Sequence, residues 1–528
     1  MRRSFDFIFI LLIAGLLSFC SMGYELLLAR LLGSLTSDAV LAQSLTVGCF
    51  LLALGLGAWT YGKAKPKSEW TFLANLEIVL AIVAAVALPL LAISSMSTSR
   101  GTRFIVAAQV ITVIIGFLSG AELPALISAA RNYSRRAFGW VLAANYLGAL
   151  CVSILLPRFL VPAFGLYMLS WVFALLTALA AGLVFLRSMR FNPSLRWPGL
   201  IIALILPPLF ARHHDDFEQF YLKSFYYVGS SSLMPAELQE TLSAHRHLPR
   251  IRRYSSPYQE IDIVEDDQEA YGMPKSGDFH LFIDQRYQFG SHTEPVYHDT
   301  MVHGAINLAR TKPATVLVIG GGDGLVAKEL LEYPEVKSIT LVELDAAVIR
   351  LAKDYPPLRA LNRGALEDPR LHVVIADGFE WLRRGGEGFD AIFIDLPHPN
   401  SIDLSRLYSV EFYEFTKRRL NDGGFVIVDF PASSVLKGSA RDAEMSTVIA
   451  ETLRAAGFGS VAAFGFWESF FIASASSREF QFDYESLDPY VSDVAAFNFA
   501  LVDVPRRPVR INSIFKPKVL KVRLDGNG

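Results

Sequence analysis

The sequence predicts a bundle of transmembrane helices followed by an α/β region, which consists of a small β-domain and a doubly wound sheet. Two observations lead to this fold class. Hydrophobic residues make up 52% of the 528-residue chain and are concentrated in the first 211 residues. In the C-terminal half, apolar runs that end in glycine or in an acidic residue alternate with helical patterns, which is typical of a parallel sheet.

The N-terminal region contains seven apolar stretches that are nearly free of charge. Most of them reach the roughly 20 residues that a membrane-spanning helix needs. The last stretch is short and contains Pro207 and Pro208, so we expect six or seven helices over residues 1–211. A cleaved signal peptide would explain the first stretch alone. The stretches cover residues 6–28, 38–60, 72–96, 104–129, 138–157, 165–186 and 197–211.

Basic residues between these stretches indicate an orientation in the membrane. If all seven stretches cross, eleven Lys and Arg lie on the side of the N-terminus and four on the other side, which places the N-terminus in the cytoplasm. An odd number of crossings would then place the C-terminal half outside. Because the seventh stretch is short, we expect that one stretch does not cross. The prediction is a multi-pass protein of the inner cell membrane with a cytoplasmic C-terminal half.

Three parts follow the bundle. Residues 212–253 form a polar and aromatic connecting segment. Residues 254–295 contain short alternating patterns that predict the strands of the small β-domain. Residues 296–528 remain for the α/β domain, which is long enough to bury one core.

A glycine-rich turn is the most informative motif of the chain. Residues 316–324 read V-L-V-I-G-G-G-D-G, and residues 341–345 read L-V-E-L-D. A strand, a glycine turn, a helix and a second strand that ends in an acid are typical of a Rossmann-type nucleotide site, although an ordinary strand-to-helix turn is the alternative. Leu325 stands where a dinucleotide fingerprint needs a small residue, so an S-adenosyl compound is favoured over NAD. Glu343 could accept hydrogen bonds from both ribose hydroxyls.

Two further strands end near acidic residues. Asp377 follows a strand over residues 371–375 and could accept a hydrogen bond from an adenine amino group. The next strand, A-I-F-I-D, ends at Asp395. Ligands of open α/β sheets bind outside the carboxyl ends of the strands, so Glu343, Asp377 and Asp395 are predicted to share one site. Each acid alone could instead cap a helix.

These motifs resemble the aminopropyltransferases, the spermidine synthase family. Further matching segments stand in family order and include residues 256–260 (S-P-Y-Q-E), 281–288 (L-F-I-D-x-x-x-Q), 297–299 (Y-H-D) and 407–413 (L-Y-S-V-E-F-Y). The resemblance covers residues 254–475. It implies that an aminopropyl group passes from decarboxylated S-adenosylmethionine to an amine acceptor such as putrescine, which gives spermidine and methylthioadenosine.

The resemblance also implies roles for individual residues, and it implies that no metal is required. Asp395 matches the family's catalytic base. This agrees with the chemistry, because an alkylammonium is almost wholly protonated at neutral pH and must lose a proton before it attacks. The donor would be bound by Gln259, Asp323, Glu343, Asp377 and Gly378. The acceptor would lie beside Tyr297, His298, Asp323, Asp395 and His398.

Selectivity for the donor and for the acceptor depends on two of these positions. Asp323 near the donor's tail would attract the ammonium of the decarboxylated compound and repel S-adenosylmethionine. The family commonly has an acid where this chain has His398, and a histidine holds a cationic amine poorly. Asp403 or Glu468 could supply the missing charge. His398 could also be a surface residue without a role, just as Tyr297 and His298 could pack in the core.

Polar residues also occur inside the apolar stretches. Glu77 and Glu122 could guide a polyamine through the bundle, because ionisable groups at membrane depth often line substrate paths. The alternative is hydrogen bonding between helices or a position near helix ends. The remaining polar residues of this kind are Glu25, Gln43, Gln109 and Asn145.

Two other classes of function stay open. One is an S-adenosylmethionine-dependent methyltransferase, and the other is a membrane sensor or transporter that binds a polyamine or nucleoside without turnover. A net charge of −2 and the lack of a basic and aromatic stripe argue against nucleic-acid binding. The expected partners are the two substrates and the lipid bilayer, and a homodimer is left open.

Overall fold

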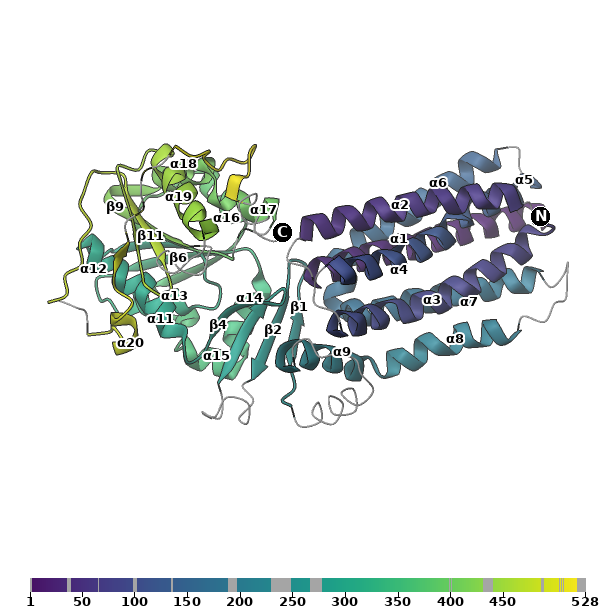
Figure 1. Ribbon diagram of the computed structural model, residues 1–528, viewed down its shortest axis with the longest axis horizontal. Helices are drawn as coiled ribbons and strands as arrows, with labels where there is room; N and C mark the ends of the chain where they lie inside the picture. Colours follow the sequence, from purple (N-terminus) through teal and green to yellow (C-terminus); the bar gives the residue numbers. More distant parts are fainter. Residues whose placement is uncertain are drawn as a thin grey trace. The chain divides into compact units, whose positions relative to one another are not determined.

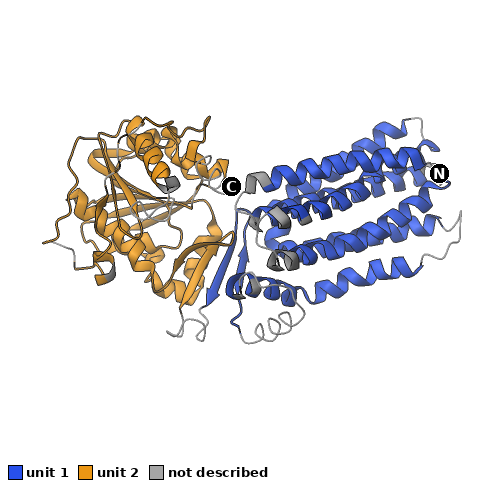
Figure 2. Ribbon diagram, in the orientation of Figure 1, with its two compact units in different colours: residues 1–267 blue, residues 268–528 orange. Residues whose placement is uncertain are grey.

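The chain forms two compact units, residues 1–267 and residues 268–528, in the computed structural model (Figure 2). The boundary falls within residues 254–295, the range that we expected to form the small β-domain. The residues that the structure describes are 2–35, 39–64, 66–97, 102–133, 136–188, 197–228, 248–265, 278–397, 399, 401–430, 440–485, 489–502, 504, 506 and 508–519.

The first unit contains a bundle of long apolar helices (Figure 1). Its helices are α1 (Arg2–Leu35), α2 (Ala39–Ala64), α3 (Glu69–Ser97), α4 (Thr102–Gly120), α5 (Glu122–Arg131), α6 (Ala137–Leu155), α7 (Val161–Ser188), α8 (Trp197–Arg212) and α9 (His214–Lys223). Single π-helical turns, Leu156–Leu160 and Ser224–Val228, follow α6 and α9. The strands β1 (Arg252–Ser255) and β2 (Glu260–Glu265) pair antiparallel.

Five described segments are long and apolar enough to cross a membrane: Phe5–Gly33, Ala42–Ala64, Glu69–Leu91, Ala108–Arg131 and Ala137–Ser188. The last has 52 residues and would measure about 78 Å as one straight helix, far more than the roughly 30 Å of a bilayer's hydrocarbon core. The backbone leaves the helical conformation at Gly165, within α7, so this segment holds two helices that meet at Gly165. The shorter apolar helix α8 matches the seventh apolar stretch.

Small residues bring the helices of the bundle close together. A Cβ at Gly120 of α4 would lie 2.2 Å from the carbonyl oxygen of Leu54, and one at Gly57 of α2 would lie 2.1 Å from that of Phe117. In lipid, where burial of apolar surface does not drive association, close backbone packing is a main source of attraction between helices. The glycines therefore explain why α2 and α4 pack along each other.

The second unit is built on an eight-stranded sheet of the order β12-β10-β11-β9-β8-β5-β6-β7, with helices on both faces (Figure 1). The strands β5 (Thr315–Gly320), β6 (Ser338–Glu343), β7 (Leu371–Ile375), β8 (Phe389–Asp395) and β9 (Leu420–Asp429) are parallel. The strands β10 (Ser460–Phe464), β11 (Phe470–Ser474) and β12 (Leu501–Val502) are added antiparallel. This is the doubly wound architecture that the sequence predicts.

Helices connect the strands of this sheet. They are α11 (Glu294–Asp299), α12 (Ala305–Ala309), α13 (Leu325–Leu331), α14 (Ala346–Asp354), α15 (Pro356–Leu361), α16 (Gly378–Arg383), α17 (Ile402–Ser405), α18 (Val410–Arg418), α19 (Ala440–Ala455) and α20 (Asp493–Ala496). A hairpin of β3 (Phe279–Ile283) and β4 (Arg286–Gly290) precedes them. The central strands read as continuous apolar runs because both faces of the sheet are covered.

Candidate active site

The candidate site lies at the carboxyl ends of the parallel strands, where the strand order reverses. The chain proceeds from β5 to β6 and β7 on one side and then returns to β8 and β9 on the other side. Gly320 at the end of β5 is the register partner of Asp395 at the end of β8. Glu343 and Asp429 end the strands β6 and β9. Such a reversal point is where open α/β sheets bind ligands.

The glycine loop approaches two of these acids closely. Gly320 has a positive φ of 83°, and a Cβ there would lie 1.8 Å from the carbonyl oxygen of Asp395. A Cβ at Gly322 would lie 2.8 Å from Oε2 of Glu343. Glycine is therefore required at position 320, where φ is positive and the contact is with backbone, whereas a side chain at position 322 would displace the Glu343 carboxylate. Asp323 of this loop accepts a hydrogen bond of 2.9 Å from the N–H of Leu325.

Asp395 lies at the centre of a compact group of side chains. The Tyr297 hydroxyl donates a hydrogen bond of 2.9 Å to Oδ1 of Asp395. One ring nitrogen of His298 and one carboxylate oxygen each of Asp323 and Asp395 lie within 4.8 Å of one another. Burial raises the pKa of Asp395, although the charge of His298 and the hydrogen bond from Tyr297 act in the opposite direction. A base with a raised pKa accepts a proton more readily.

His298 is buried beside an acid. Its Nδ1 lies 3.1 Å from Oε1 of Glu294, whose carboxylate also accepts a hydrogen bond of 3.0 Å from Lys328. Burial alone would lower the pKa of His298, but Glu294 raises it to about 9. The imidazole is therefore protonated at neutral pH, and a metal ion on His298, Asp323 and Asp395 would have to displace this proton. The absence of a metal requirement stays a prediction.

Two of the acids that are predicted to bind the donor substrate have raised pKa values. Burial raises the pKa of Asp323 to about 6 and that of Glu343 to about 7. The N–H of Asp345 donates a hydrogen bond of 2.8 Å to Glu343, which offsets part of this effect. A cationic ligand would favour the ionised form of both acids.

Asp377 and Gly378 follow β7, as the sequence predicts. Asp377 caps α16 by accepting a hydrogen bond of 3.1 Å from the N–H of Glu380, and its other oxygen pairs with Arg406. The helix-capping alternative therefore holds for Asp377 in this structure, and its contact with adenine stays a prediction. A Cβ at Gly378 would lie 2.7 Å from Ile319, so this glycine lets α16 pack against β5.

Two of the predicted site residues are not among the described residues of the second unit. Gln259 belongs to the first unit, in the turn between β1 and β2, where its N–H donates a hydrogen bond of 2.9 Å to Oγ of Ser256. Arg30 of α1 lies 3.5 Å from Oε1 of Glu260 in the same segment. His398 falls outside the residues that the structure describes. The roles of Gln259 and His398 stay predictions.

The sequence interpretation missed Asp429. Residues 425–429 read F-V-I-V-D, an apolar strand that ends in an acid like A-I-F-I-D, and this signal was available. The neighbouring strands place Val428 beside Ile394, so Asp429 lies near Asp395. Burial, followed by the charges of Asp395 and Glu468, holds the pKa of Asp429 well above its usual range. Glu468 lies two residues before Phe470, the register partner of Asp429.

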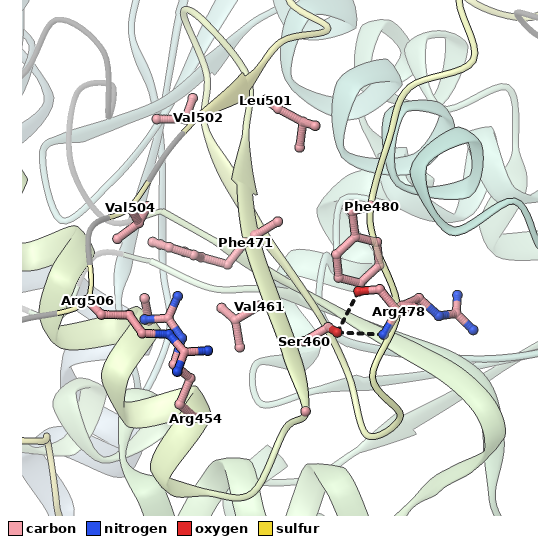
Figure 3. Close-up of a pocket in the computed structure, with 13 residues that line it drawn as sticks. Arg454, Ser460, Val461, Phe471, Arg478, Phe480, Leu501, Val502, Val504 and Arg506 are labelled. Atoms are coloured by element: carbon pink, nitrogen blue, oxygen red, sulfur yellow. Dashed lines mark hydrogen bonds between the residues drawn. The ribbon is translucent and has the colours of Figure 1, made fainter.

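A cavity of about 510 Å³ lies elsewhere on the second unit (Figure 3). It is lined by Ser460 and Phe471 and by the cations Arg454, Arg478 and Arg506. The strand register aligns Ser460 with Ser474 and then with Phe425. Phe471, in contrast, is the register partner of Val428, next to Asp429. None of the residues that line the cavity is an acid of the candidate site.

Comparisons with known proteins show the family to which this chain belongs. A glycine loop and strand-end acids around a reversal point are typical of an enzyme that uses an S-adenosyl donor. Residues 294–438 match the family model "Spermine/spermidine synthase domain". Polyamine aminopropyltransferase 1 of Streptomyces coelicolor is 33% identical over 429 residues, which are 80% of this chain and 75% of that protein. This chain belongs to the polyamine aminopropyltransferase family, and the resemblance deduced from the motifs is confirmed.

Two further relatives extend the comparison. The polyamine aminopropyltransferase of Leptospira interrogans is 28% identical over 512 residues, which are 94% of each chain. A solved structure of spermidine synthase in complex with the transition state analogue AdoDATO is 24% identical, with a TM-score of 0.40. It covers 52% of this chain and 89% of that chain.

Proposed function

We propose that this protein transfers an aminopropyl group from decarboxylated S-adenosylmethionine to an amine, with putrescine as the first acceptor to test. Family membership supports the reaction. The observation that carries the proposal is the convergence of His298, Asp323 and Asp395 within 4.8 Å beside the glycine loop. These residues offer a base for an amine and a carboxylate for an ammonium.

The reaction needs one new bond and one proton transfer. The amine nitrogen attacks the carbon next to the donor's sulfonium, the carbon–sulfur bond breaks, and its electron pair stays on sulfur in methylthioadenosine. Asp395 takes the proton from the nitrogen, and Tyr297 orients Asp395 through its hydrogen bond. Glu343 would hold the ribose, and Asp323 would attract the ammonium of the aminopropyl chain.

The acceptor's second ammonium would bind at Asp429 and Glu468. Asp429 lies beside Asp395 across neighbouring strands, and Glu468 contributes negative charge to the same region. These two acids could replace the carboxylate that the family commonly has where this chain has His398. A diamine with one nitrogen at Asp395 would then leave its other nitrogen near a second negative charge.

The protein would act at the inner cell membrane. Five helices that are long and apolar enough to cross a bilayer support a multi-pass location with lipid contacts. We place the second unit in the cytoplasm, where the decarboxylated donor is expected. The relative from Leptospira interrogans aligns over 94% of this chain, so the alignment includes most of the helical region.

Mass spectrometry of the products tests this function. The purified full-length protein is given decarboxylated or ordinary S-adenosylmethionine together with a panel of amines. We expect aminopropylated amine and methylthioadenosine with the decarboxylated donor alone. Methylated amine and S-adenosylhomocysteine would favour the methyltransferase, and donor binding without any product would favour a binding protein.

A further inference from the structure

The helical bundle buries two carboxyl groups that lack partners for their oxygens. Glu77 of α3 is 0% exposed and Glu122 of α5 is 5% exposed. Among the described residues, neither oxygen of Glu77 has a hydrogen-bond partner, and Oε1 of Glu122 has none. The charge of Glu77 acts on Glu122, and α3 packs against α5. Buried polar groups are nearly always satisfied, so the unpaired oxygens point to a missing ligand.

Two helices meet at this position within one apolar span, separated by the single residue Ala121, which keeps right-handed helical backbone angles. The span Ala108–Arg131 contains α4, which ends at Gly120, and α5, which begins at Glu122. Glu122 therefore lies in the first turn of a helix, whose free N–H groups stabilise a carboxylate. Interrupted helices inside membranes are a recurrent feature of sites that bind substrates and ions.

Polar groups of two other helices surround the pair. Tyr24 of α1 and Thr177 of α7 are hydrogen-bonded at 3.2 Å between their hydroxyls. Tyr24 interacts electrostatically with both Glu77 and Glu122. Groups from α1, α3, α5 and α7 thus interact with one another inside a bundle whose buried residues are mostly apolar.

The chemistry of Glu77 and Glu122 favours a cationic ligand. Two adjacent carboxylates in apolar surroundings repel each other, and a cation between them removes this cost. Ionised carboxylates only accept hydrogen bonds, whereas a primary ammonium offers three N–H donors and carries an apolar chain. The residues one turn from Glu77 on the same helix face, Ala74 and Ala81, are small and buried, and such residues suit a methylene chain.

We propose that Glu77 and Glu122 form a binding site inside the bundle for an ammonium group of a polyamine. The choice of ligand rests on the proposed function, because the acceptor and the product of the enzyme are polyamines. The site is separate from the acids of the second unit. It gives the bundle a role as a polyamine-binding or polyamine-conducting element in addition to anchoring.

Equilibrium dialysis with labelled spermidine tests this site in the full-length protein in lipid nanodiscs. We expect two bound spermidine molecules per chain. Glu77→Gln and Glu122→Gln should each weaken one of the two sites by about tenfold or more, the effect of losing one buried charge contact of roughly 1.4 kcal/mol. Glu69→Gln is the control, because Glu69 lies on the same helix but accepts a hydrogen bond from Ser128.

The outcomes separate this site from the proposed function. Aminopropyl transfer by Glu77→Gln at the wild-type rate shows that the variant is folded. Loss of one site in that variant supports the inference, even if the wild-type protein transfers no aminopropyl group and the proposed function fails. Spermidine binding that Glu77→Gln and Glu122→Gln both leave unchanged overturns the inference, whether the wild-type protein shows one site or two, and even when transfer is normal.

Discussion

Single residues of the candidate site show an excess of buried negative charge. Burial raises the pKa values of Asp323, Glu343, Asp395 and Asp429. His298 is protonated and interacts with Asp323 and Asp395 of these four acids, and it is also paired with Glu294. Cationic substrates would complete this charge balance, since the donor carries a sulfonium and an ammonium and the acceptor is an amine. The residues therefore favour cations over neutral or anionic ligands.

Donor binding should strengthen as the pH rises. The pKa values of about 6 for Asp323 and about 7 for Glu343 lie above the usual range, so both acids are neutral under acidic conditions and ionised under alkaline ones. The ionised forms attract the cationic donor. Calorimetry should show the dissociation constant of decarboxylated S-adenosylmethionine falling between about pH 5 and about pH 8. Glu343→Gln should remove the upper part of this dependence, and a flat profile in the wild-type protein would contradict the assignment.

Asp429→Asn should weaken binding of the acceptor more than binding of the donor. The variant loses the charge for the second ammonium, and we expect the Michaelis constant for putrescine to rise about tenfold, the effect of one contact of roughly 1.4 kcal/mol. A monoamine of similar length should be affected much less. Asp422→Asn is the control, because Asp422 is an exposed residue near the other end of the same strand, β9. Equal loss for the diamine and the monoamine would remove Asp429 from acceptor recognition.

The site residues that could be predicted from the sequence are those that belong to recognised motifs. Glu343 and Asp395 end apolar strands next to recognised motifs, and the structure places both beside the glycine loop. Asp429 ends a strand of the same pattern but belongs to no motif. The pairing of Asp377 with Arg406 could not be predicted, because Arg406 lies 29 residues further along the chain and meets Asp377 only in the folded protein.

Among the structural elements, the glycine loop is the one on which the site depends most. Gly322→Ala should weaken donor binding by about tenfold or more, because the new Cβ would lie 2.9 Å from Cγ of Glu343 and displace its carboxylate. The dissociation constant from calorimetry measures this effect. Gly139→Ala in α6 is a matched control, since a Cβ there meets nothing within 4 Å. An unchanged donor affinity in Gly322→Ala would show that Glu343 does not hold the donor.

Helices and strands that a short stretch of sequence indicates could be predicted. Strands whose order depends on pairing between segments far apart in the chain could not. The strand over residues 371–375 and the strand end at Asp395 occur where the sequence predicts them. The antiparallel strands β10, β11 and β12 have no comparable signal, because their order is set by pairing between distant segments. Apolar length likewise predicted the helices of the bundle but not the break between α4 and α5.

The whole molecule combines a helical bundle with an enzyme of a known family. Within the first unit, Arg30 of α1 contacts Glu260 and the carbonyl oxygen of Ser256, which flank the predicted donor ligand Gln259. The apolar helix α1, which is long enough to cross a membrane, is thus linked to the S-P-Y-Q-E segment. Composition predicted the division into an apolar and an α/β part, since apolar stretches of this length occur only in the first 211 residues. The orientation in the membrane rests on charge counts and stays a prediction.

The central claim is that two acids at the ends of strands have different roles: Asp395 removes the proton from the acceptor, and Glu343 binds the donor. The most direct test measures turnover and donor affinity side by side in full-length Asp395→Asn. Loss of a general base commonly costs about 10²–10⁴ in rate, so turnover should fall by this factor while the dissociation constant of decarboxylated S-adenosylmethionine stays within about twofold. Unchanged turnover, or a loss of donor affinity that accounts for the whole defect, would contradict the claim.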